Sequence, residues 1–446
     1  MREILATFRN GTGKLWMETT RQDRDIVLHY SQPSIHAAWM MKYWQKEIND
    51  GLLFYRNNRW GTEKAFYDSA LDVSYMAYGQ LEQGLLAQRR PRAFVLPLSS
   101  CMSMKEIEAV RQYVREGGVL IADMACALRD EHGKPYPRGM LDDVFGIERD
   151  AGYKNTIALL RGTLSGREGE AALYIEQGVW PASGKAQTRM VCKEKPAGLP
   201  LVIVNSFGKG RAIYLGFTGL YNQMRQAKPQ LSGLYREVFG GVAGLRGRYR
   251  VTAGGDALLP GQTLVHACGD ADYFGFYQDL SFVLPPDKTT DDAEEADVKA
   301  GARKAQFQLP AARHVYDLLD GRYLGRIDRF DFLSVPGRGR LYAALPYQVK
   351  AIDLSLPGRA QAGEVLSLTL SLRKEGTGRA LHVYHLEVAG PDGKILPYYT
   401  RNLSAPDGMA ECKLQFPLNA EPGRYTVTVR DAASGTRAAC KVKVVR

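Results

Sequence analysis

The first half of the chain alternates short apolar runs with segments of helical periodicity. Three apolar runs have the length of buried strands, and they are residues 25–31 (DIVLHYS), 92–100 (RAFVLPLSS) and 118–125 (GVLIADMA). Between them the sequence predicts helices over 33–48 and 62–84, and a third that begins at Ser103, which forms a capping box with Glu106. This order of strands and helices predicts right-handed crossovers in a parallel sheet.

The predicted helix 33–48 is apolar on two sides. Two rows of side chains at i, i+4 spacing lie about 140° apart, and they are Ile35, Trp39 and Tyr43, and Met40, Trp44 and Ile48. Such a helix packs one side on a sheet and the other on a second layer or another subunit. Because an exposed Trp39 or Trp44 would leave an apolar patch in water, the pattern favours self-association.

Strands dominate after residue 155. Residues 199–206 and 211–217 read as strands, and Phe207-Gly208-Lys209-Gly210 joins them. A phosphate-binding loop places its glycines between a strand and a helix, so this segment is interpreted as a hairpin turn. A last helix is predicted at about 230–240, where Gly240 and Gly241 end it.

Everything after about residue 247 reads as β-structure. The acidic and then basic run 288–304 (KTTDDAEEADVKAGARK) is predicted to be a solvated loop. From residue 350 on, six or seven segments alternate at period 2 and are separated by turns such as Pro391-Asp392-Gly393. This spacing is typical of a β-sandwich.

Charge and hydropathy exclude two classes of partner. Lys and Arg number 59 against 48 for Asp and Glu, so the formal net charge is +11, which alone would suggest nucleic-acid binding. The basic residues are interleaved with acidic ones, however, apart from one compact cluster at Arg89, Arg90 and Arg92, and this distribution argues against it. No apolar run reaches the roughly 18 residues of a membrane span, and the N-terminus has no signal-peptide core. As written, the chain is expected in the cytoplasm.

The six cysteines show no C-x-x-C spacing and no nearby paired histidines. We therefore predict no metal site and expect no cofactor. Cys412 and Cys440 lie on predicted strands near the C-terminus and could form a disulfide, but the sequence does not place their Cα atoms.

Cys126 is the best enzymatic candidate because it directly follows the buried strand 118–125. In flavodoxin-like hydrolases and glutamine amidotransferases a nucleophile occupies such a turn, with glycines two residues to either side. Here those positions hold Met124 and Leu128, and the only nearby partner is His132 in a polar loop. The favoured interpretation is a degenerate, non-catalytic turn, with an active thiol hydrolase as the alternative.

The strand exit at Ser31, Ser34 and His36 lacks a G-x-S-x-G elbow, so its hydroxyls are interpreted as helix caps. The adjacent acidic pairs, among them Asp130-Glu131 and Asp142-Asp143, are interpreted as solvated groups or caps rather than a glycosidase pair.

Aromatic clusters are the candidates for sugar binding. Tyr384, Tyr398 and Tyr399 lie in the predicted sandwich, and the segment 271–279 contains Tyr273, Phe274, Phe276 and Tyr277. Packing is the favoured role for such rings. A carbohydrate-binding module that uses Tyr398 and Tyr399 remains an alternative.

Three segments in this order resemble the trimerisation domain of family 42 β-galactosidases, and they are residues 25–39, 92–135 and 201–217. The most specific parts are Y-S-Q-P-S, E-G-G-V-L-I-A-D with its D-E-H-G loop, and G-K-G-R. The resemblance implies an amidotransferase-like α/β module whose catalytic triad is lost and which can oligomerise, with a trimer as the candidate assembly. Residues 248–446 resemble, less specifically, the β-rich C-terminal extensions of related multidomain proteins.

The resemblance also implies a domain organisation. We expect a linker at 1–22 from an N-terminal barrel, an amidotransferase-like domain at 23–243, a β-rich domain at 244–346 and an Ig-like β-sandwich at 347–446. In the family the catalytic glutamates belong to that barrel, which this sequence lacks. The expectation is a non-catalytic accessory region of a glycoside hydrolase of carbohydrate metabolism, inactive alone.

Overall fold

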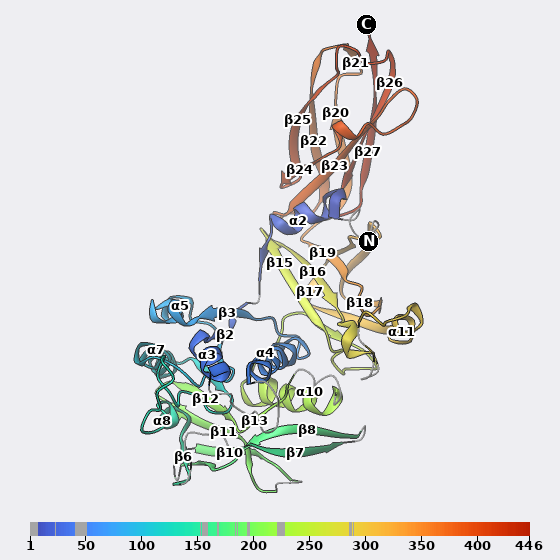
Figure 1. Ribbon diagram of the computed structural model, residues 1–446. Helices are drawn as coiled ribbons and strands as arrows, with labels where there is room; N and C mark the ends of the chain where they lie inside the picture. The colour runs from blue at the N-terminus through green and yellow to red at the C-terminus, as the bar shows by residue number, and fades with distance from the viewer. Residues whose placement is uncertain are drawn as a thin grey trace.

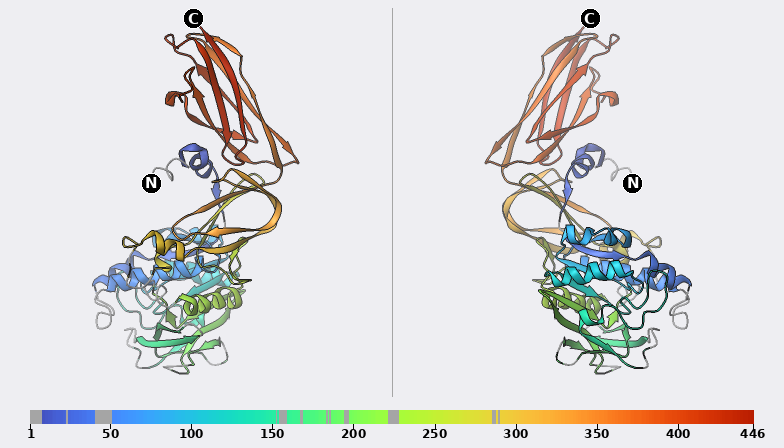
Figure 2. Two further views of the ribbon diagram at one scale, coloured as in Figure 1. Left: turned by 90° about the vertical axis from the view of Figure 1, so that its right-hand side faces the viewer. Right: turned by 90° about the vertical axis from the view of Figure 1, so that its left-hand side faces the viewer.

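The computed structural model describes residues 8–22, 24–40, 51–151, 153, 159–166, 169–182, 184, 186–193, 197–220, 228–284, 288 and 290–446. The chain is elongated, with an α/β part at one end, a β-rich part in the middle and a β-sandwich at the other end (Figure 1). Both side views keep the sandwich at the end opposite the α/β part (Figure 2). Among the described residues, no helix combines the length and apolarity needed to cross a bilayer.

A seven-stranded sheet organises the α/β part, in the order β10-β11-β12-β5-β4-β2-β3. The parallel strands are β2 (Ile26–Tyr30), β3 (Ser74–Ala77), β4 (Ala93–Leu96), β5 (Val119–Ala122) and β12 (Gly210–Leu215). Two further strands, β11 (Pro200–Phe207) and β10 (Ala186–Val191), extend the sheet by antiparallel pairing. The β11–β12 connection at 207–210 is the hairpin that the sequence predicts.

Helices cover both faces of this sheet. Ile26 and Leu28 of β2 face α4 (Gly51–Tyr67) and α10 (Lys228–Arg236), in a core that includes a stacked Phe66–Phe239 pair with centroids 3.9 Å apart. Val27, between them, faces the opposite core, which is closed by α7 (Met104–Arg115). Buried strands with apolar side chains on both faces are expected for a parallel sheet. The predicted capping box at the start of α7 is confirmed.

The predicted helix 62–84 is wrong in its second half. Helix α4 ends at Tyr67, residues 74–77 form β3, and a short helix α5 (Tyr78–Glu82) follows. Residues 74–77 pair in parallel with β2, and their side chains alternate between buried and half-buried. Strand pairing therefore overrides the helical periodicity of this segment. The predicted helix 33–48 appears as α3 (Gln32–Met40), and residues 41–50, including Trp44, lie outside the described part.

A small antiparallel sheet of β7 (Leu159–Gly166), β8 (Gly169–Glu176) and β13 (Phe217–Thr218) stands beside the central sheet, with a two-stranded pair of β6 (Ile147–Arg149) and β9 (Val179–Pro181). These strands matter because β8 ends at Glu176 and β6 ends at Arg149. Glu176 accepts a backbone N–H of the turn that follows β5, and Arg149 donates to Glu176.

The middle part is a seven-stranded antiparallel sheet. Its strands are β1 (Thr20–Arg21), β14 (Arg250–Thr252), β15 (Gln262–Cys268), β16 (Ala271–Tyr277), β17 (Arg303–Asp317), β18 (Arg322–Ser334) and β19 (Arg340–Leu345). The predicted loop 288–304 contains a short helix, α11 (Glu295–Ala300), and this corrects the prediction. Glu294 and Asp297 form a capping box there, and no residue of α11 is buried, so the segment is solvated as expected.

The C-terminal part is the predicted sandwich. One sheet contains β20 (Gln348–Ser355), β22 (Val365–Glu375) and β25 (Met409–Gln415). The other contains β21 (Arg359–Gln361), β23 (Leu381–Ala389), β24 (Arg401–Pro406), β26 (Gly423–Asp431) and β27 (Arg437–Val445). One apolar core lies between them. Cys412 and Cys440 are both free thiols.

Residues 8–22 bridge all three parts. The π-helical turn η1 (Phe8–Thr12) and α2 (Gly13–Met17) lie at the junction of the sandwich and the middle sheet (Figure 1). Leu15 is fully buried there beside Tyr273 and Val383. Arg21 of β1 then reaches the α/β part through a bidentate pair with Asp72 at 2.7 Å. The expected linker thus contacts all three parts.

Candidate functional site

The carboxyl edge of the central sheet is where a parallel α/β fold places a ligand or a nucleophile. The turn after β5 runs from Asp123 to Cys126 at this edge. Ala125 and Ala127 adopt φ of +59° and +50°, and Leu98 after β4 adopts +42°. Residues other than glycine rarely occupy this region, and such strain is concentrated at functional sites. The backbone therefore has the conformation of an elbow without its glycines.

The thiol of Cys126 is buried in the core on the α7 side of the sheet. Burial, with the nearby Asp123 carboxylate as a second cause, raises the pKa of this thiol well above its usual value. A reactive cysteine needs the opposite conditions, which are access to solvent and a positive neighbour that stabilises the thiolate. Cys126 is therefore held as a neutral thiol.

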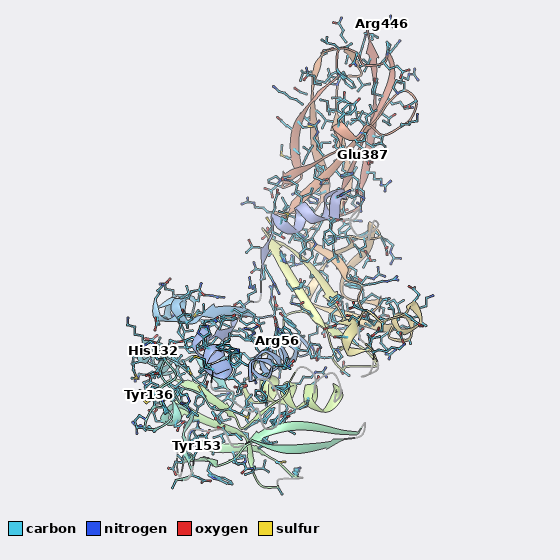
Figure 3. The ribbon with its side chains drawn as sticks, in the orientation of Figure 1. Arg56, His132, Tyr136, Tyr153, Glu387 and Arg446 are labelled. Atoms are coloured by element: carbon cyan, nitrogen blue, oxygen red, sulfur yellow. The ribbon has the colours of Figure 1, made fainter. Side chains whose placement is uncertain are left out.

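His132 lies in an exposed loop at the outer side of the α/β part (Figure 3). Its imidazole Nε2 is 3.9 Å from a carboxylate oxygen of Glu131, and its backbone N–H donates to Asp130 at 3.0 Å. Within the described residues no hydrogen bond joins it to Cys126. The structure thus does not bring the two candidate groups together.

Glu176 contacts the elbow at Ala125, the residue before Cys126. Its buried carboxylate accepts hydrogen bonds from Tyr153 and Tyr214 at 2.5 Å each and from Arg149 at 3.1 Å. The backbone N–H of Ala125 also donates to it at 3.2 Å. In an active elbow the backbone N–H of the residue after the nucleophile stabilises the oxyanion, and that residue would be Ala127 here. The Ala127 N–H instead donates to the carbonyl of Ser99 at 2.9 Å, so this donor is already taken.

Arg149 joins this cluster to a second carboxylate. Its guanidinium lies 3.0 Å from Asp142, and burial raises the pKa of Asp142 while Arg149 opposes the shift. The sequence predicts Asp142 to be solvated or a cap, whereas the structure buries most of it in an ion pair. The distances between Glu176, Arg149 and Tyr214 along the chain explain why no sequence pattern revealed the cluster. We call these residues, with Tyr153 and Asp142, the Glu176 network.

Asp123 fastens the same edge from the other side. Its carboxylate accepts hydrogen bonds from Asn58 of α4 at 2.6 Å and from the backbone N–H of Leu98 at 2.5 Å. Burial raises the pKa of Asp123 to about 7, although both hydrogen bonds oppose the shift. Asp123 therefore links the exits of β4 and β5 to α4, and its carboxyl group is only partly protonated at pH 7.

The turn after β2 has a structural role. The Ser31 and Ser34 hydroxyls are 2.7 Å apart, and the Ser31 hydroxyl accepts the backbone N–H of Ser34. Ser34 also accepts the backbone N–H of Cys101 at 2.9 Å, so the start of α3 is fastened to the loop after β4. The ring of His36 contacts Gln32 on the surface of α3.

A buried chain of Ser99, His29 and Glu106 was not anticipated from the sequence. The ring of His29 lies 2.9 Å from the Ser99 hydroxyl through Nδ1 and 2.9 Å from Glu106 through Nε2. The order of the groups is that of a hydrolase triad. All three side chains are completely buried, however, and Glu106 also accepts the backbone N–H of Ser103 at the start of α7. The chain therefore fastens α7 to the sheet.

The aromatic candidates in the sandwich differ in exposure. Tyr399 is buried and donates its hydroxyl to the carbonyl of Gln415 at 2.9 Å, whereas Tyr398 is exposed. Their ring centroids lie 4.7 Å apart. Only Tyr398 is thus presented to a ligand. Across the residues that the structure describes, no group of three or more His, Cys, Asp or Glu is arranged to hold a metal ion.

Residues 89–244 match the family described as the β-galactosidase trimerisation domain. The resemblance seen in the sequence is confirmed, as is the α/β domain followed by β-rich structure. No curated relative matches the sequence.

Three solved structures illustrate the likeness. Gan42B, a GH42 β-galactosidase from G. stearothermophilus, has 17% identity and a TM-score of 0.48, over 73% of this chain and 40% of that one. A β-galactosidase from Bacillus circulans sp. alkalophilus has 14% identity and a TM-score of 0.47, over 73% and 42%. A GH42 exo-carrageenase from Bacteroides ovatus has 11% identity and a TM-score of 0.32, over 73% of this chain and 29% of that one. The chain spans about 40% of the length of the β-galactosidases that it matches.

Proposed function

We propose that this chain, which carries a β-galactosidase trimerisation domain, serves as the non-catalytic, self-associating region of a family 42-type glycoside hydrolase. Residues 23–243 are the self-associating domain in this proposal, and 244–346 and 347–446 are two β-rich accessory domains. The observation that carries the non-catalytic part is the state of the elbow, because the Cys126 thiol is buried and the Ala127 N–H that an oxyanion would need donates to the carbonyl of Ser99.

Chemistry at the elbow would need four changes at once. The Cys126 thiol would have to reach solvent, lose its proton and find a base, and the Ala127 N–H would have to be released by the carbonyl of Ser99. Each change opposes a buried interaction described above. The alternative of a thiol hydrolase is therefore not supported. The alternative of a sugar-binding sandwich depends on Tyr398 alone.

Self-association is proposed to use the exposed end of α3. Trp39 and Met40 are both largely exposed there, although they are large and apolar. An apolar patch of this kind on a small domain favours contact with a partner. The name of the matched family points to a threefold assembly, which would have three times the 49.5 kDa mass of the chain.

Sedimentation velocity over a range of protein concentrations tests the proposal. The wild-type chain should sediment as a trimer, and Trp39→Glu should shift it towards the monomer. Tyr398→Glu is the matched control, since Tyr398 and Trp39 are each 66% exposed, and it should leave the trimer intact. A wild-type monomer at all concentrations would refute self-association.

The proposal that the chain is non-catalytic needs a separate assay. The purified chain should show no hydrolysis of a chromogenic galactoside and no esterase activity that Cys126→Ala removes. Galactoside hydrolysis by the chain alone, or an esterase activity lost in Cys126→Ala, would refute it.

A further inference from the structure

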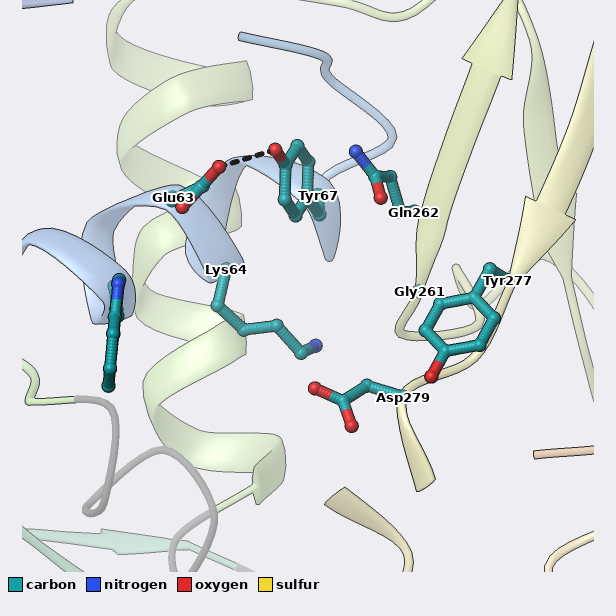
Figure 4. A pocket seen from close by; sticks show the side chains of 8 residues that line it. Glu63, Lys64, Tyr67, Gly261, Gln262, Tyr277 and Asp279 are labelled. Carbon is teal, nitrogen blue, oxygen red and sulfur yellow. Dashed lines mark hydrogen bonds between the residues drawn. The ribbon is translucent and has the colours of Figure 1, made fainter. Parts of the chain in front are cut away.

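A groove lies between α4 and the paired strands β15 and β16. It has a volume of about 420 Å³ and is lined by Trp60, Glu63, Lys64, Tyr67, Gly261, Gln262, Tyr277 and Asp279 (Figure 4). A second cavity of about 410 Å³ shares Lys64 and Asp279 with it. Small-molecule sites have volumes of roughly 300–1,000 Å³, so the first groove alone has room for a small ligand. We call it the α4–β16 groove.

Aromatic rings form much of its wall. Trp60 and Tyr277 keep over a third of their surface exposed, and Tyr67 is half-buried. Figure 4 shows Tyr277 on the strand side and Tyr67 on the α4 side of the groove. The guanidinium of Arg56 lies 4.9 Å from the centroid of Trp60 and so steadies that ring. Broad exposed rings in a concavity offer a flat apolar contact to a ligand.

Polar groups of both signs meet in the same space. Lys64 is buried and paired with Asp68, and its chain extends across the groove towards Asp279 (Figure 4). Glu63 accepts the Tyr67 hydroxyl at 2.6 Å. Gln262 adds an amide. The groove thus presents both hydrogen-bond donors and acceptors.

These charges select the class of ligand. A cation would be repelled by the Lys64 ammonium, and an anion would be repelled by Glu63 and Asp279. A wholly apolar molecule would cover charged groups without replacing the hydrogen bonds that those groups make to water. A neutral ring with an apolar face and several hydroxyl groups avoids all three costs. We propose that the α4–β16 groove binds a saccharide, stacked on Trp60 or Tyr277 and hydrogen-bonded by Lys64, Asp279 and Glu63.

The groove also shows which residue of the aromatic segment 271–279 is available to a ligand. In the segment 271–279, Tyr273, Phe274 and Phe276 are buried in packed cores, whereas Tyr277 projects into the groove. The inference differs from the proposed function, since neither Trp39 nor the Glu176 network contributes to the groove. Either proposal can fail while the other holds.

Isothermal titration calorimetry of the full chain tests the inference with four neutral sugars, which are galactose, glucose, lactose and cellobiose. At least one should bind saturably at millimolar concentration. Trp60→Ala and Tyr277→Ala should each weaken that binding about tenfold or more, and Asp279→Asn, which preserves the shape of the side chain, should also weaken it.

Two control variants match the exposure of the removed rings. Trp180 is 40% exposed against 38% for Trp60, and Tyr78 is 39% exposed, as is Tyr277. Trp180→Ala and Tyr78→Ala should bind sugar as the wild type does. Thermal melts identify any variant that fails to fold, and Asp279→Asn then decides the outcome.

Three results would overturn the inference. The first is no saturable binding of any of the four sugars by the wild type. The second is tighter binding of choline or inorganic phosphate than of any sugar, since both are charged. The third is sugar binding that survives Trp60→Ala, Tyr277→Ala and Asp279→Asn but is lost in Tyr398→Ala, which would place the site in the sandwich.

Discussion

Removing the charge of Glu176 should destabilise the α/β part strongly. The carboxylate is buried and accepts hydrogen bonds from Arg149, Tyr153, Tyr214 and the backbone N–H of Ala125. Glu176→Gln preserves the size of the side chain, but its NH₂ group cannot accept from the donors that now face that oxygen. The substitution therefore tests the charge and the hydrogen bonds without creating a cavity.

The size of the effect follows from the partners that remain. Breaking a buried ion pair by removing one partner costs about 3–5 kcal/mol. Arg149 retains Asp142 at 3.0 Å, and the amide retains one acceptor oxygen, so the lower end applies. We expect Glu176→Gln to reduce the free energy of unfolding by about 3 kcal/mol. In a double-mutant cycle with Arg149→Met, the two losses should be less than additive by about 1 kcal/mol or more.

Urea unfolding measures the free energy, and hydrogen exchange of the Ala125 amide measures the local effect. Glu176→Gln should speed that exchange, because the amide loses a charged acceptor. Glu148→Gln is the control, since Glu148 is an exposed glutamate on the neighbouring strand β6, and it should change neither quantity. If Glu176→Gln unfolds within about 0.5 kcal/mol of the wild type and leaves the Ala125 amide protected, the network does not hold the elbow.

Three further predictions concern other parts of the chain. The pKa of Asp123 is about 7 in the folded protein against an ordinary 3.8. Protonated Asp123 therefore stabilises the fold fully below pH 4, and this stabilisation is lost as pH rises through 7. Stability should fall by at most about 1.4 kcal/mol per pH unit in that window, and the fall should be shallower in Asp123→Asn; an unchanged slope would contradict this. A thiol reagent should label half-exposed Cys268 well before buried Cys126, as mass spectrometry of the native chain can show, and equal rates would count against a sealed elbow. Leu15→Ala should cost about 2–5 kcal/mol and expose residues 8–22 to proteolysis, unlike the exposed control Met17→Ala.

Local sequence signals determine a large share of this protein. The apolar runs 92–100 and 118–125 and the capping box at Ser103 predict β4, α7 and β5, because helix capping and strand burial depend on residues a few positions apart. Period-2 alternation after residue 350 likewise predicts the sandwich. The order of the segments 25–39, 92–135 and 201–217 along the chain carries the resemblance to the trimerisation domain.

Contacts between distant segments decided the rest. Residues 74–77 become a strand because β2 offers them a pairing partner, although the local periodicity favours a helix. The Glu176 network joins side chains from β6, β8 and β12, and Thr19 contacts His266, which lies 247 residues later in the chain. The sequence could suggest Cys126 as a nucleophile, but only the folded chain shows its thiol buried and the following amide, that of Ala127, bound to the carbonyl of Ser99. Such contacts depend on how segments far apart in the sequence pack together in the folded chain, and no local pattern of residues encodes that packing.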